Sequence, residues 1–342
     1  VDFALGPLTY HRLPEILTKI HRKHGQTVID TDFPAEAKFD FLPENKAEGG
    51  CSFLAVQEGC NNFCTYCVVP YTRGAEYSRP VAEVIAEAKD LLKTGTLEIN
   101  VLGQNVNSYH GEDENGKERN LAYLLRRLAE LDGLKRLRYT TSYPADVDDD
   151  LIACHHDLAQ LMPYLHLPVQ SGSDKILKAM NRRHDRAKYL EVIDKLRKAN
   201  DKLRFSSDFI VGFPNETDED FKQTLSLVNE VKYIQAYSFK YSRRAGTPAA
   251  VMAGQVEEKV KKARLDELQA LLFDYQDKFN RSCVGKVFPV LFEQSGRHNG
   301  QLIGRTPYMQ NLHAKADESL LNKIVDVRVE SATTNSLSGK VL

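Results

Sequence analysis

The segment Cys60-Asn-Asn-Phe-Cys64-Thr-Tyr-Cys67 holds three of the six cysteines in this sequence of 342 residues. It comes directly after residues 53–57, an apolar run with the composition of a buried strand. Thiolates are soft ligands that favour zinc, copper(I) or iron–sulfur clusters. Three thiolates in one short loop can bind three irons of a 4Fe-4S cluster and leave the fourth iron open. The segment therefore predicts an iron–sulfur site at the end of a strand.

Two other interpretations of these cysteines have to be weighed. They could form the buried face of a helix, because a free thiol packs as a small apolar group. Gly59, Asn62 and Pro70 disfavour a helix at this place. They could also bind a structural zinc ion, but such a site usually needs a fourth ligand, and the nearest histidines are His24 and His110. We therefore favour the cluster.

Short apolar runs alternate with amphipathic stretches from residue 52 to residue 241. This alternation is typical of a parallel sheet or barrel whose strands are joined by helices. Six strands are expected, at residues 53–57, 97–102, 136–141, 164–169, 205–211 and 236–241. Crossover helices are expected at residues 80–92, 121–131, 186–199 and 218–231. The sequence thus predicts an α/β fold of the partial (β/α)6 barrel type.

The pattern changes after the last of these strands. A long charged helix is expected at residues 256–280. Beyond Cys283, four short β runs separated by Gly, Asn, Pro and Asp are expected at residues 287–292, 301–304, 309–313 and 324–329. They predict a small C-terminal β-barrel. The first 45 residues are too few for an independent domain and include one helical stretch at residues 12–24. The expected units are therefore residues 1–45, 46–280 and 281–342.

Composition limits the possible functions. The 46 Lys and Arg nearly balance the 47 Asp and Glu, so any nucleic-acid site has to be a local patch. No apolar run of 18 residues occurs, which argues against a membrane span. The remaining cysteines, Cys51, Cys154 and Cys283, are isolated and do not resemble a secreted disulfide framework. We therefore expect a cytoplasmic protein without a membrane partner.

The residues around the cysteines resemble a known family. The spacing C-x-x-x-C-x-x-C after a first barrel strand is that of the radical S-adenosylmethionine (SAM) superfamily. Residues 57–80, with Val-Val-Pro-Tyr-Thr-Arg-Gly and Ser-Arg-Pro, are similar to the MiaB-type tRNA methylthiotransferases, and so is Leu102-Gly-Gln-Asn-Val-Asn-Ser-Tyr109. Further similar stretches lie at residues 139–142, 165–173, 180–183, 208–214, 216–217 and 241–248. Residues 281–342 resemble the TRAM domain, a small RNA-binding barrel.

This resemblance implies a reaction, its cofactors and its partners. Family members attach a methylthio group to C2 of an isopentenylated adenosine beside the tRNA anticodon. Cys60, Cys64 and Cys67 would then bind a 4Fe-4S cluster whose open iron binds SAM. One SAM gives the methyl group and a second gives the radical, while an auxiliary 4Fe-4S cluster gives the sulfur. The implied partners are the anticodon stem-loop of tRNA and an electron donor such as flavodoxin or ferredoxin, and we expect a monomer.

Polar residues follow several of the expected strands, where catalytic groups of such barrels lie. Four of them are expected to contact SAM or substrate, namely Gln104, Ser142, Gln170 and Asp208. Each could instead be a residue that caps a loop. Arg73 and Arg79 could bind phosphate or cap loops, and the sequence does not decide between these roles. It singles out no catalytic side chain.

In one respect the sequence departs from the family. Members hold the auxiliary cluster with three cysteines of an N-terminal domain, and the first 50 residues contain no cysteine. Residues 1–14 resemble the end of that domain, so we expect most of it to be missing. Cys51, Cys154 and Cys283 are too far apart in sequence to be obvious replacements. The resulting hypothesis is a chain that binds one cluster and cleaves SAM but does not donate sulfur.

The sequence is also compatible with two other functions. A sister methylthiotransferase acts on threonylcarbamoyl-adenosine of tRNA or on a ribosomal protein, although residues 68–73 and 103–107 favour the isopentenyladenosine branch. The chain could also be a non-catalytic RNA-binding fragment that keeps the TRAM-like barrel. The presence of all three motif cysteines argues against that alternative.

Overall fold

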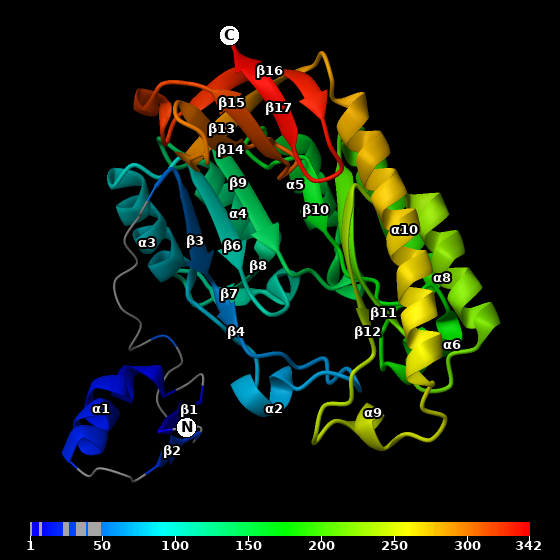
Figure 1. The fold of residues 1–342 in the computed structure, drawn as a ribbon. Coiled ribbons are helices and arrows are strands. Elements are labelled where there is room, and N and C mark those ends of the chain that lie inside the picture. The colour runs from blue at the N-terminus through cyan, green and yellow to red at the C-terminus, as the bar shows by residue number, and fades with distance from the viewer. Residues whose placement is uncertain (1, 7–8, 23–26, 32–38, 40–48) are drawn as a thin grey trace.

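The computed structural model describes residues 2–6, 9–22, 27–31, 39 and 49–342. Its main sheet layer consists of six strands, β3 (Cys51–Ala55), β6 (Glu98–Leu102), β9 (Arg136–Thr140), β10 (Tyr164–His166), β11 (Arg204–Val211) and β12 (Gln235–Lys240). They pair in parallel in the orders β3-β6-β9 and β10-β11-β12. The predicted α/β fold with six parallel strands is therefore confirmed (Figure 1).

The ladder of hydrogen bonds is interrupted between β9 and β10. Leu137 of β9 forms an isolated bridge with Leu161, and Pro163 then precedes β10. Proline has no N–H group with which to continue a ladder. The fourth strand, expected at residues 164–169, starts at residue 164 but ends at His166, where Pro168 again offers no N–H group.

Four helices connect the strands as expected, namely α3 (Val81–Lys93), α4 (Leu121–Ala129), α7 (Arg186–Ala199) and α8 (Asp218–Val231). The last three begin after a side chain that accepts a hydrogen bond from the first turn, contributed by Asn120, Asp185 and Thr217. Their apolar faces are buried in one core with the strands. The sequence did not predict α5 (Asp149–Asp157), because Asp and His make up most of its residues.

Shorter elements lie in the connections. They are β4 (Gln57–Glu58), α2 (Val69–Arg73), β5 (Tyr77–Ser78), β7 (His110–Glu112), β8 (Glu118–Asn120), α6 (Asp174–Ala179) and α9 (Pro248–Val251). Near the N-terminus, β1 (Phe3–Leu5) pairs with β2 (Val28–Asp30), and α1 (Leu13–Arg22) lies between them in sequence. The helix expected at residues 12–24 is thus confirmed up to Arg22. Residues 23–24 and the expected boundary at residues 45–46 lie outside the described residues.

A long helix, α10 (Glu258–Ser282), leads from the sheet to the small barrel. The strands of this barrel are β13 (Val287–Ser295), β14 (Gln301–Arg305), β15 (Asn311–Lys315), β16 (Ile324–Ala332) and β17 (Leu337–Val341). They close in the order β13-β14-β15-β17-β16 around a separate apolar core. The predicted C-terminal β-barrel is confirmed. Its last strand was not predicted, because Leu-Ser-Gly-Lys-Val is short and half polar.

The small barrel packs against the amino-terminal ends of β3, β6 and β9 (Figure 1). Gly50 N donates to Asn322 Oδ1 at 2.9 Å. Arg138 of β9 donates to the carbonyl oxygens of Pro307 and Thr306 at 2.9 and 3.2 Å. The carboxyl ends of the strands, after which the cysteines follow, therefore lie at the opposite end of the sheet. Among the described residues, no helix has the length and apolar character that a membrane span requires.

Candidate cofactor site

Residues 59–68, called the cysteine loop below, connect β4 to α2 without forming a helix. Each of its three sulfurs accepts at least one N–H···S hydrogen bond. Asn62 Nδ2 donates to Cys60 Sγ at 3.6 Å, and Val69 N donates to Cys67 Sγ at 3.5 Å. Arg182 Nη1 donates to Cys64 Sγ at 3.6 Å. The cysteines are thus not one face of a helix, and their sulfurs lie among polar hydrogen donors.

The electrostatics of the cysteine loop are consistent with binding of a metal centre, which takes the place of the thiol protons. Burial raises the pKa of the Cys60 and Cys67 thiols, and the neighbouring Cys64 sulfur raises them further. A metal centre that binds thiolates removes this mutual repulsion and releases the protons. Within the described residues, no three His, Cys, Asp or Glu side chains are close enough to hold one metal ion. The fit of a 4Fe-4S cluster therefore rests on the donor set of the loop, since a cluster distributes its thiolates over different irons.

Gln104, one of the expected site residues, braces the cysteine loop. Its Oε1 accepts a hydrogen bond from Gly59 N at 2.7 Å, and Gly59 has a φ of +82° that favours glycine. Nearby, the buried Gln57 accepts from Asn105 N at 3.0 Å and donates to Ser108 Oγ at 2.8 Å. Two glutamine side chains thus fix the loop after β6 to the start of the cysteine loop.

Ser142 and Gln170 follow β9 and β10 at the same end of the sheet. The Ser142 hydroxyl is buried and has no hydrogen-bond partner among the described residues, so a polar ligand could satisfy it. Gln170 has a φ of +77°, an uncommon conformation for a residue with a side chain. Its backbone bonds to Asp208 and Ile210 of β11 at 3.0 Å each. The structure therefore brings Gln170 and Asp208 together.

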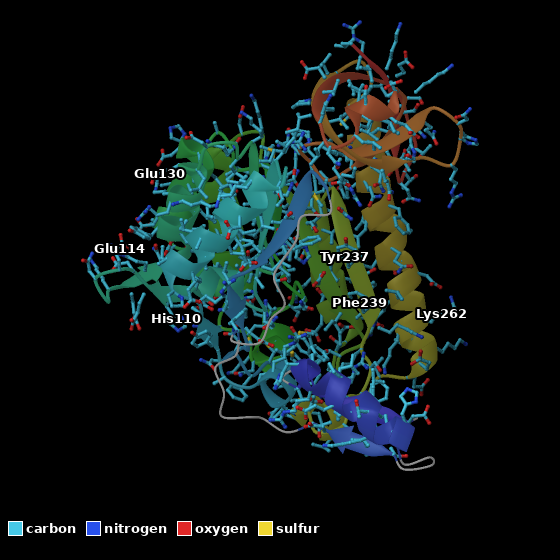
Figure 2. All side chains as sticks on the ribbon, turned by 90° about the vertical axis from the view of Figure 1, so that its left-hand side faces the viewer. His110, Glu114, Glu130, Tyr237, Phe239 and Lys262 are labelled. Atoms are coloured by element: carbon cyan, nitrogen blue, oxygen red, sulfur yellow. The ribbon has the colours of Figure 1, made fainter. Side chains whose placement is uncertain are left out.

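Asp208 lies on the same face of the β10-β11-β12 sheet as His166, which the sequence analysis did not single out. Its Oδ1 is 3.5 Å from His166 Nε2, and His166 Nδ1 is 2.8 Å from Ser206 Oγ. Tyr237 pairs with Asp208 in register and meets the His166 ring edge-on. Figure 2 shows Tyr237 and Phe239 along β12, where both side chains are about half exposed. Polar and aromatic groups thus meet on this face.

Arg182 is a second residue that sequence reasoning missed. Besides its bond to Cys64, its Nη2 donates to the carbonyl oxygen of Pro168 at 2.7 Å. The guanidinium carbon lies 4.1 Å from the centre of the Tyr143 ring. The signal in the sequence was a pair of arginines in the loop at residues 180–183, but nothing in it indicated which one faces a cysteine.

The two arginines with undecided roles both meet carboxylates. Arg79 Nη1 donates to Glu87 Oε2 at 2.6 Å and to the carbonyl oxygen of Ala55 at 2.9 Å. Arg73 Nη1 donates to Glu58 Oε1 at 2.9 Å. These contacts support the loop-capping role over phosphate binding.

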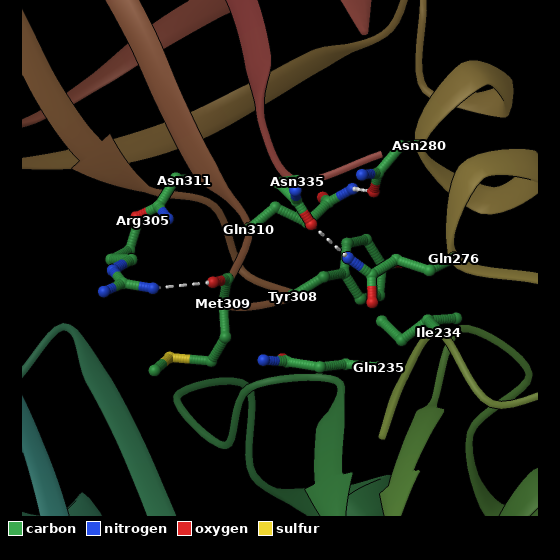
Figure 3. A pocket seen from close by; sticks show the side chains of 10 residues that line it. All are labelled: Ile234, Gln235, Gln276, Asn280, Arg305, Tyr308, Met309, Gln310, Asn311 and Asn335. Atoms are coloured by element: carbon green, nitrogen blue, oxygen red, sulfur yellow. Dashed lines mark hydrogen bonds between the residues drawn. The ribbon is translucent and has the colours of Figure 1, made fainter. Parts of the chain in front are cut away.

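A small polar pocket lies away from the cysteine loop. It is at the contact between the α/β part and the small barrel, called the seam below. Its volume is about 60 Å³, enough for a few water molecules. Figure 3 shows Gln276 and Gln310 in hydrogen bonds with neighbouring amides and Arg305 bonded to the backbone of Met309. Most of the polar groups that line it thus bind one another, and the pocket belongs to the seam.

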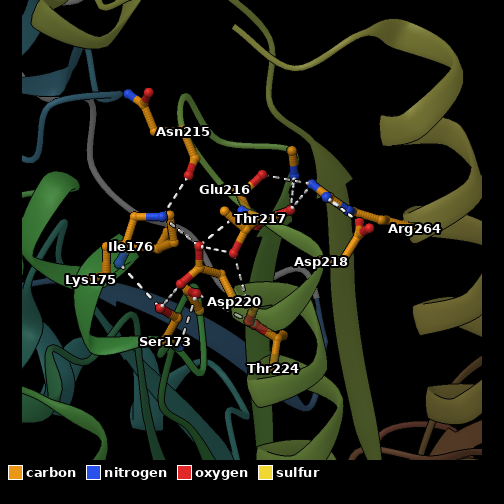
Figure 4. Close-up of polar contacts among 12 residues, drawn as sticks. Ser173, Lys175, Ile176, Asn215, Glu216, Thr217, Asp218, Asp220, Thr224 and Arg264 are labelled. Carbon is orange, nitrogen blue, oxygen red and sulfur yellow. Dashed lines mark hydrogen bonds and ion pairs between the residues drawn. The ribbon is translucent and has the colours of Figure 1, made fainter. Parts of the chain in front are cut away.

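A polar network fixes the loop after β11 (Figure 4). Glu216 Oε1 accepts from Gly212 N at 2.7 Å and from Arg264 Nη1 of α10 at 2.8 Å. Burial raises the pKa of Glu216 to about 7. Asp220 accepts from Ser173 and Lys175 at 2.7 Å each. Burial alone would raise the Asp220 pKa, but its hydrogen bonds outweigh burial and lower it. The network attaches this loop to α6 and α10.

The three isolated cysteines lie in separate places. Cys154 is buried and donates to the carbonyl oxygen of Ala122 at 3.6 Å. Cys283 is buried in the core of the small barrel. Cys51 lies on β3 at the seam, where burial raises the pKa of its thiol to about 12. They do not form a second ligand set with one another among the described residues.

Two family models match this chain. The model of the radical SAM superfamily matches residues 54–228, a range that contains the cysteine loop, the end of β3 and the whole of β6, β9, β10 and β11. The model of the TRAM domain matches residues 281–342, which form the small barrel.

Similar proteins include the tRNA-2-methylthio-N(6)-dimethylallyladenosine synthase of Rickettsia canadensis (strain McKiel). It is 53% identical over 343 residues, and the match covers 100% of this chain and 77% of the relative. One similar solved structure is the radical SAM methyltransferase TsrM from Kitasatospora setae, with cobalamin and a 4Fe-4S cluster bound. It has a TM-score of 0.47 and 18% identity over 59% of this chain and 39% of that chain.

Another is SuiB from Streptococcus suis bound to SAM, with a TM-score of 0.46 and 14% identity over 66% of this chain and 47% of that chain. This chain thus matches less than half the length of either solved protein.

Proposed function

Since this chain belongs to the radical SAM superfamily and, within it, to the tRNA-2-methylthio-N(6)-dimethylallyladenosine synthase family, we propose that it is a tRNA methylthiotransferase. Its substrate would be C2 of N6-isopentenyladenosine next to the anticodon. The observation that carries this proposal is the 53% identity to the Rickettsia canadensis enzyme over the whole chain. A non-catalytic RNA-binding role is less consistent with a cysteine loop in which every sulfur receives a hydrogen bond.

Cys60, Cys64 and Cys67 would hold the 4Fe-4S cluster. When bound, such a cluster supplies the electron that cleaves SAM. Around it, Gln104 holds the cysteine loop against the end of β6 through Gly59. The buried Ser142 hydroxyl, which has no partner among the described residues, is the best placed of the four expected residues to accept or donate a hydrogen bond to SAM.

The face that carries Asp208 is the proposed place of the adenosine. Asp208 and His166 lie 3.5 Å apart there and could hold or accept a proton at Oδ1 or Nε2. Tyr237 and Phe239 present exposed rings (Figure 2), and aromatic rings are what RNA-binding proteins use to stack unpaired bases. We propose that Gln170, fixed to the backbone of Asp208, positions this pair.

The small barrel and the cluster site would each bind a macromolecular partner. The small barrel would contact the anticodon stem-loop, and a flavodoxin or ferredoxin would deliver electrons to a cytoplasmic, monomeric enzyme. We propose domain limits of 46–280 for the SAM-binding part and 281–342 for the RNA-binding barrel, and α10, which ends at Ser282, supports the second limit. Residues 1–45 would belong to a third unit.

The proposal is tested with the anaerobically reconstituted chain, SAM, dithionite and three anticodon stem-loop RNAs. The RNAs carry isopentenyladenosine, threonylcarbamoyl-adenosine or unmodified adenosine. The assay measures 5′-deoxyadenosine and methylthiolated nucleosides separately. We expect cleavage of SAM that the isopentenyladenosine RNA stimulates most, without methylthiolated product, because Cys51, Cys154 and Cys283 form no second ligand set among the described residues. Preference for either of the other RNAs would assign a different substrate, and a loaded chain that cleaves no SAM would overturn the enzymatic proposal.

A further inference from the structure

We propose that Arg182 sets the reduction potential of the cluster site by placing an uncompensated positive charge against Cys64. This inference rests on the proposed function, because it requires that the cysteine loop hold a 4Fe-4S cluster. In this role Arg182 acts on the cluster through Cys64 and does not itself contact the substrate.

Three contacts fix the Arg182 guanidinium. Nη1 points to Cys64 Sγ at 3.6 Å, and Nη2 donates to the carbonyl oxygen of Pro168 at 2.7 Å. The guanidinium carbon lies over the Tyr143 ring, 4.1 Å from its centroid. Tyr143 is itself only 4% exposed, and its hydroxyl accepts from Arg183 N at 2.7 Å. These contacts hold the guanidinium beside the sulfur.

The charge of Arg182 lacks a compensating anion among these contacts. A thiol, a carbonyl and an aromatic ring are all neutral, and the Arg182 Nε atom is buried without a hydrogen-bond partner among the described residues. The adjacent Arg183 differs, since it donates to Asp146 Oδ1 at 2.6 Å and its side chain is 56% exposed. A buried cation is costly when it has no partner. Its natural counter-charge is the anionic group that Cys64 would bind.

The direction of the effect follows from charge. Three thiolates around a 4Fe-4S core give a net negative charge, and the uptake of one electron from a low-potential donor makes it more negative by one unit. Hydrogen bonds to sulfur and nearby cations favour the reduced state and raise the potential. Asn62 and the Val69 amide are neutral donors to the other two sulfurs. Arg182 is therefore the charged donor to the sulfurs of the cysteine loop.

The test is a redox titration monitored by electron paramagnetic resonance on reconstituted wild type, Arg182→Gln, Arg182→Lys and Arg186→Gln. Arg186→Gln removes the same charge from an arginine that pairs with Glu230 at 2.8 Å, and serves as the matched control. At the wild-type midpoint we expect Arg182→Gln to lower the ratio of reduced to oxidised cluster about tenfold, a shift of about 59 mV for one electron. Arg182→Lys should recover part of this loss, and Arg186→Gln should change the ratio less than twofold.

Each other outcome is also decisive. A fully loaded Arg182→Gln chain with a wild-type potential would overturn the inference, and so would an equal shift in Arg186→Gln. If Arg182→Gln binds no cluster, Arg182→Met is titrated in its place. If neither neutral variant loads while Arg182→Lys does, the charge is needed for assembly, and the role in setting the potential is rejected. A wild-type chain without a cluster would overturn the proposed function as well, which separates the two failures.

Discussion

Glu98 Oε1 accepts a hydrogen bond from Arg138 Nε at 2.8 Å, and the two side chains are only 2% and 4% exposed. Glu98 Oε2 lies 3.3 Å from Arg136 Nη1. Both guanidinium groups continue to backbone carbonyl oxygens of the small barrel, Arg138 to Thr306 and Arg136 to Pro289. One carboxylate on β6 thus orients two arginines that join the sheet to the barrel. This seam lies at the end of the sheet opposite to the cysteine loop.

Replacing Glu98 should weaken the whole molecule. Glu98→Ala leaves two buried guanidinium groups without their anion, and loss of one partner of a buried ion pair costs about 3–5 kcal/mol. Urea unfolding followed by circular dichroism should show a lower midpoint. Asp274→Ala breaks the exposed pair with Lys278 on α10 and should hardly move it. Equal midpoints for Glu98→Ala and wild type would contradict this account of the seam.

Buried His155 predicts a loss of stability in acid. Burial lowers its pKa to about 4 from the ordinary value of 6.5, while its Nε2 lies 2.7 Å from the Tyr139 hydroxyl. Below pH 6.5 His155 binds a proton in the unfolded chain, whereas in the folded chain it stays neutral down to about pH 4. The contribution of His155 to the free energy of unfolding should therefore fall by roughly 3 kcal/mol between pH 6.5 and pH 4.

The contribution of His155 is isolated by substitution. His155→Gln keeps a polar partner for Tyr139 but does not titrate, so its unfolding free energy should depend less on pH over that range. His156→Gln, at an exposed position of the same helix, should keep the wild-type slope. Identical slopes for wild type and His155→Gln would rule out this residue as the cause.

The positions of the six cysteines predict how much iron these 342 residues bind. Reconstituted chain should hold about four irons and absorb at about 400 nm, because Cys51, Cys154 and Cys283 lie apart. Cys64→Ala should lose most of the iron and all 5′-deoxyadenosine formation. Cys154→Ala should keep both, because its thiol bonds only to the carbonyl of Ala122 among the described residues. About eight irons per chain together with methylthiolated RNA would show that the remaining cysteines do form a second site.

Gln104 should control how firmly the cluster is held. Gln104→Leu leaves the Gly59 amide without its acceptor, and an unsatisfied buried donor costs about 1–3 kcal/mol. We expect iron to be lost to a chelator several times faster than from wild type. Gln160→Leu removes a comparable bond, from Gln160 Nε2 to the carbonyl oxygen of Ala129 at 3.2 Å, far from the loop. Equal rates for the two variants would mean that Gln104 does not brace the loop.

Local sequence predicted the parallel strands and their helices well, because each element carries its own signal. The apolar spacing and the N-caps give α7 and α8 the bounds that were expected. The interruption between β9 and β10 was not predicted, since it depends on which segment pairs with Leu137. The strand β17 was missed for a similar reason. Its polar residues become a strand because they pair with β15 and β16.

The candidate site, like the fold, was predicted from the sequence only in part. The three cysteines lie within eight residues, and their chemistry depends on spacing that can be read along the chain. Arg182 and Cys64 are 118 residues apart in sequence, and His166 and Asp208 are brought together by pairing of β10 with β11. Sequence alone determined what the cysteine loop can bind. Only tertiary structure decided which charges and hydrogen bonds surround it, because those contacts come from loops at the ends of different strands.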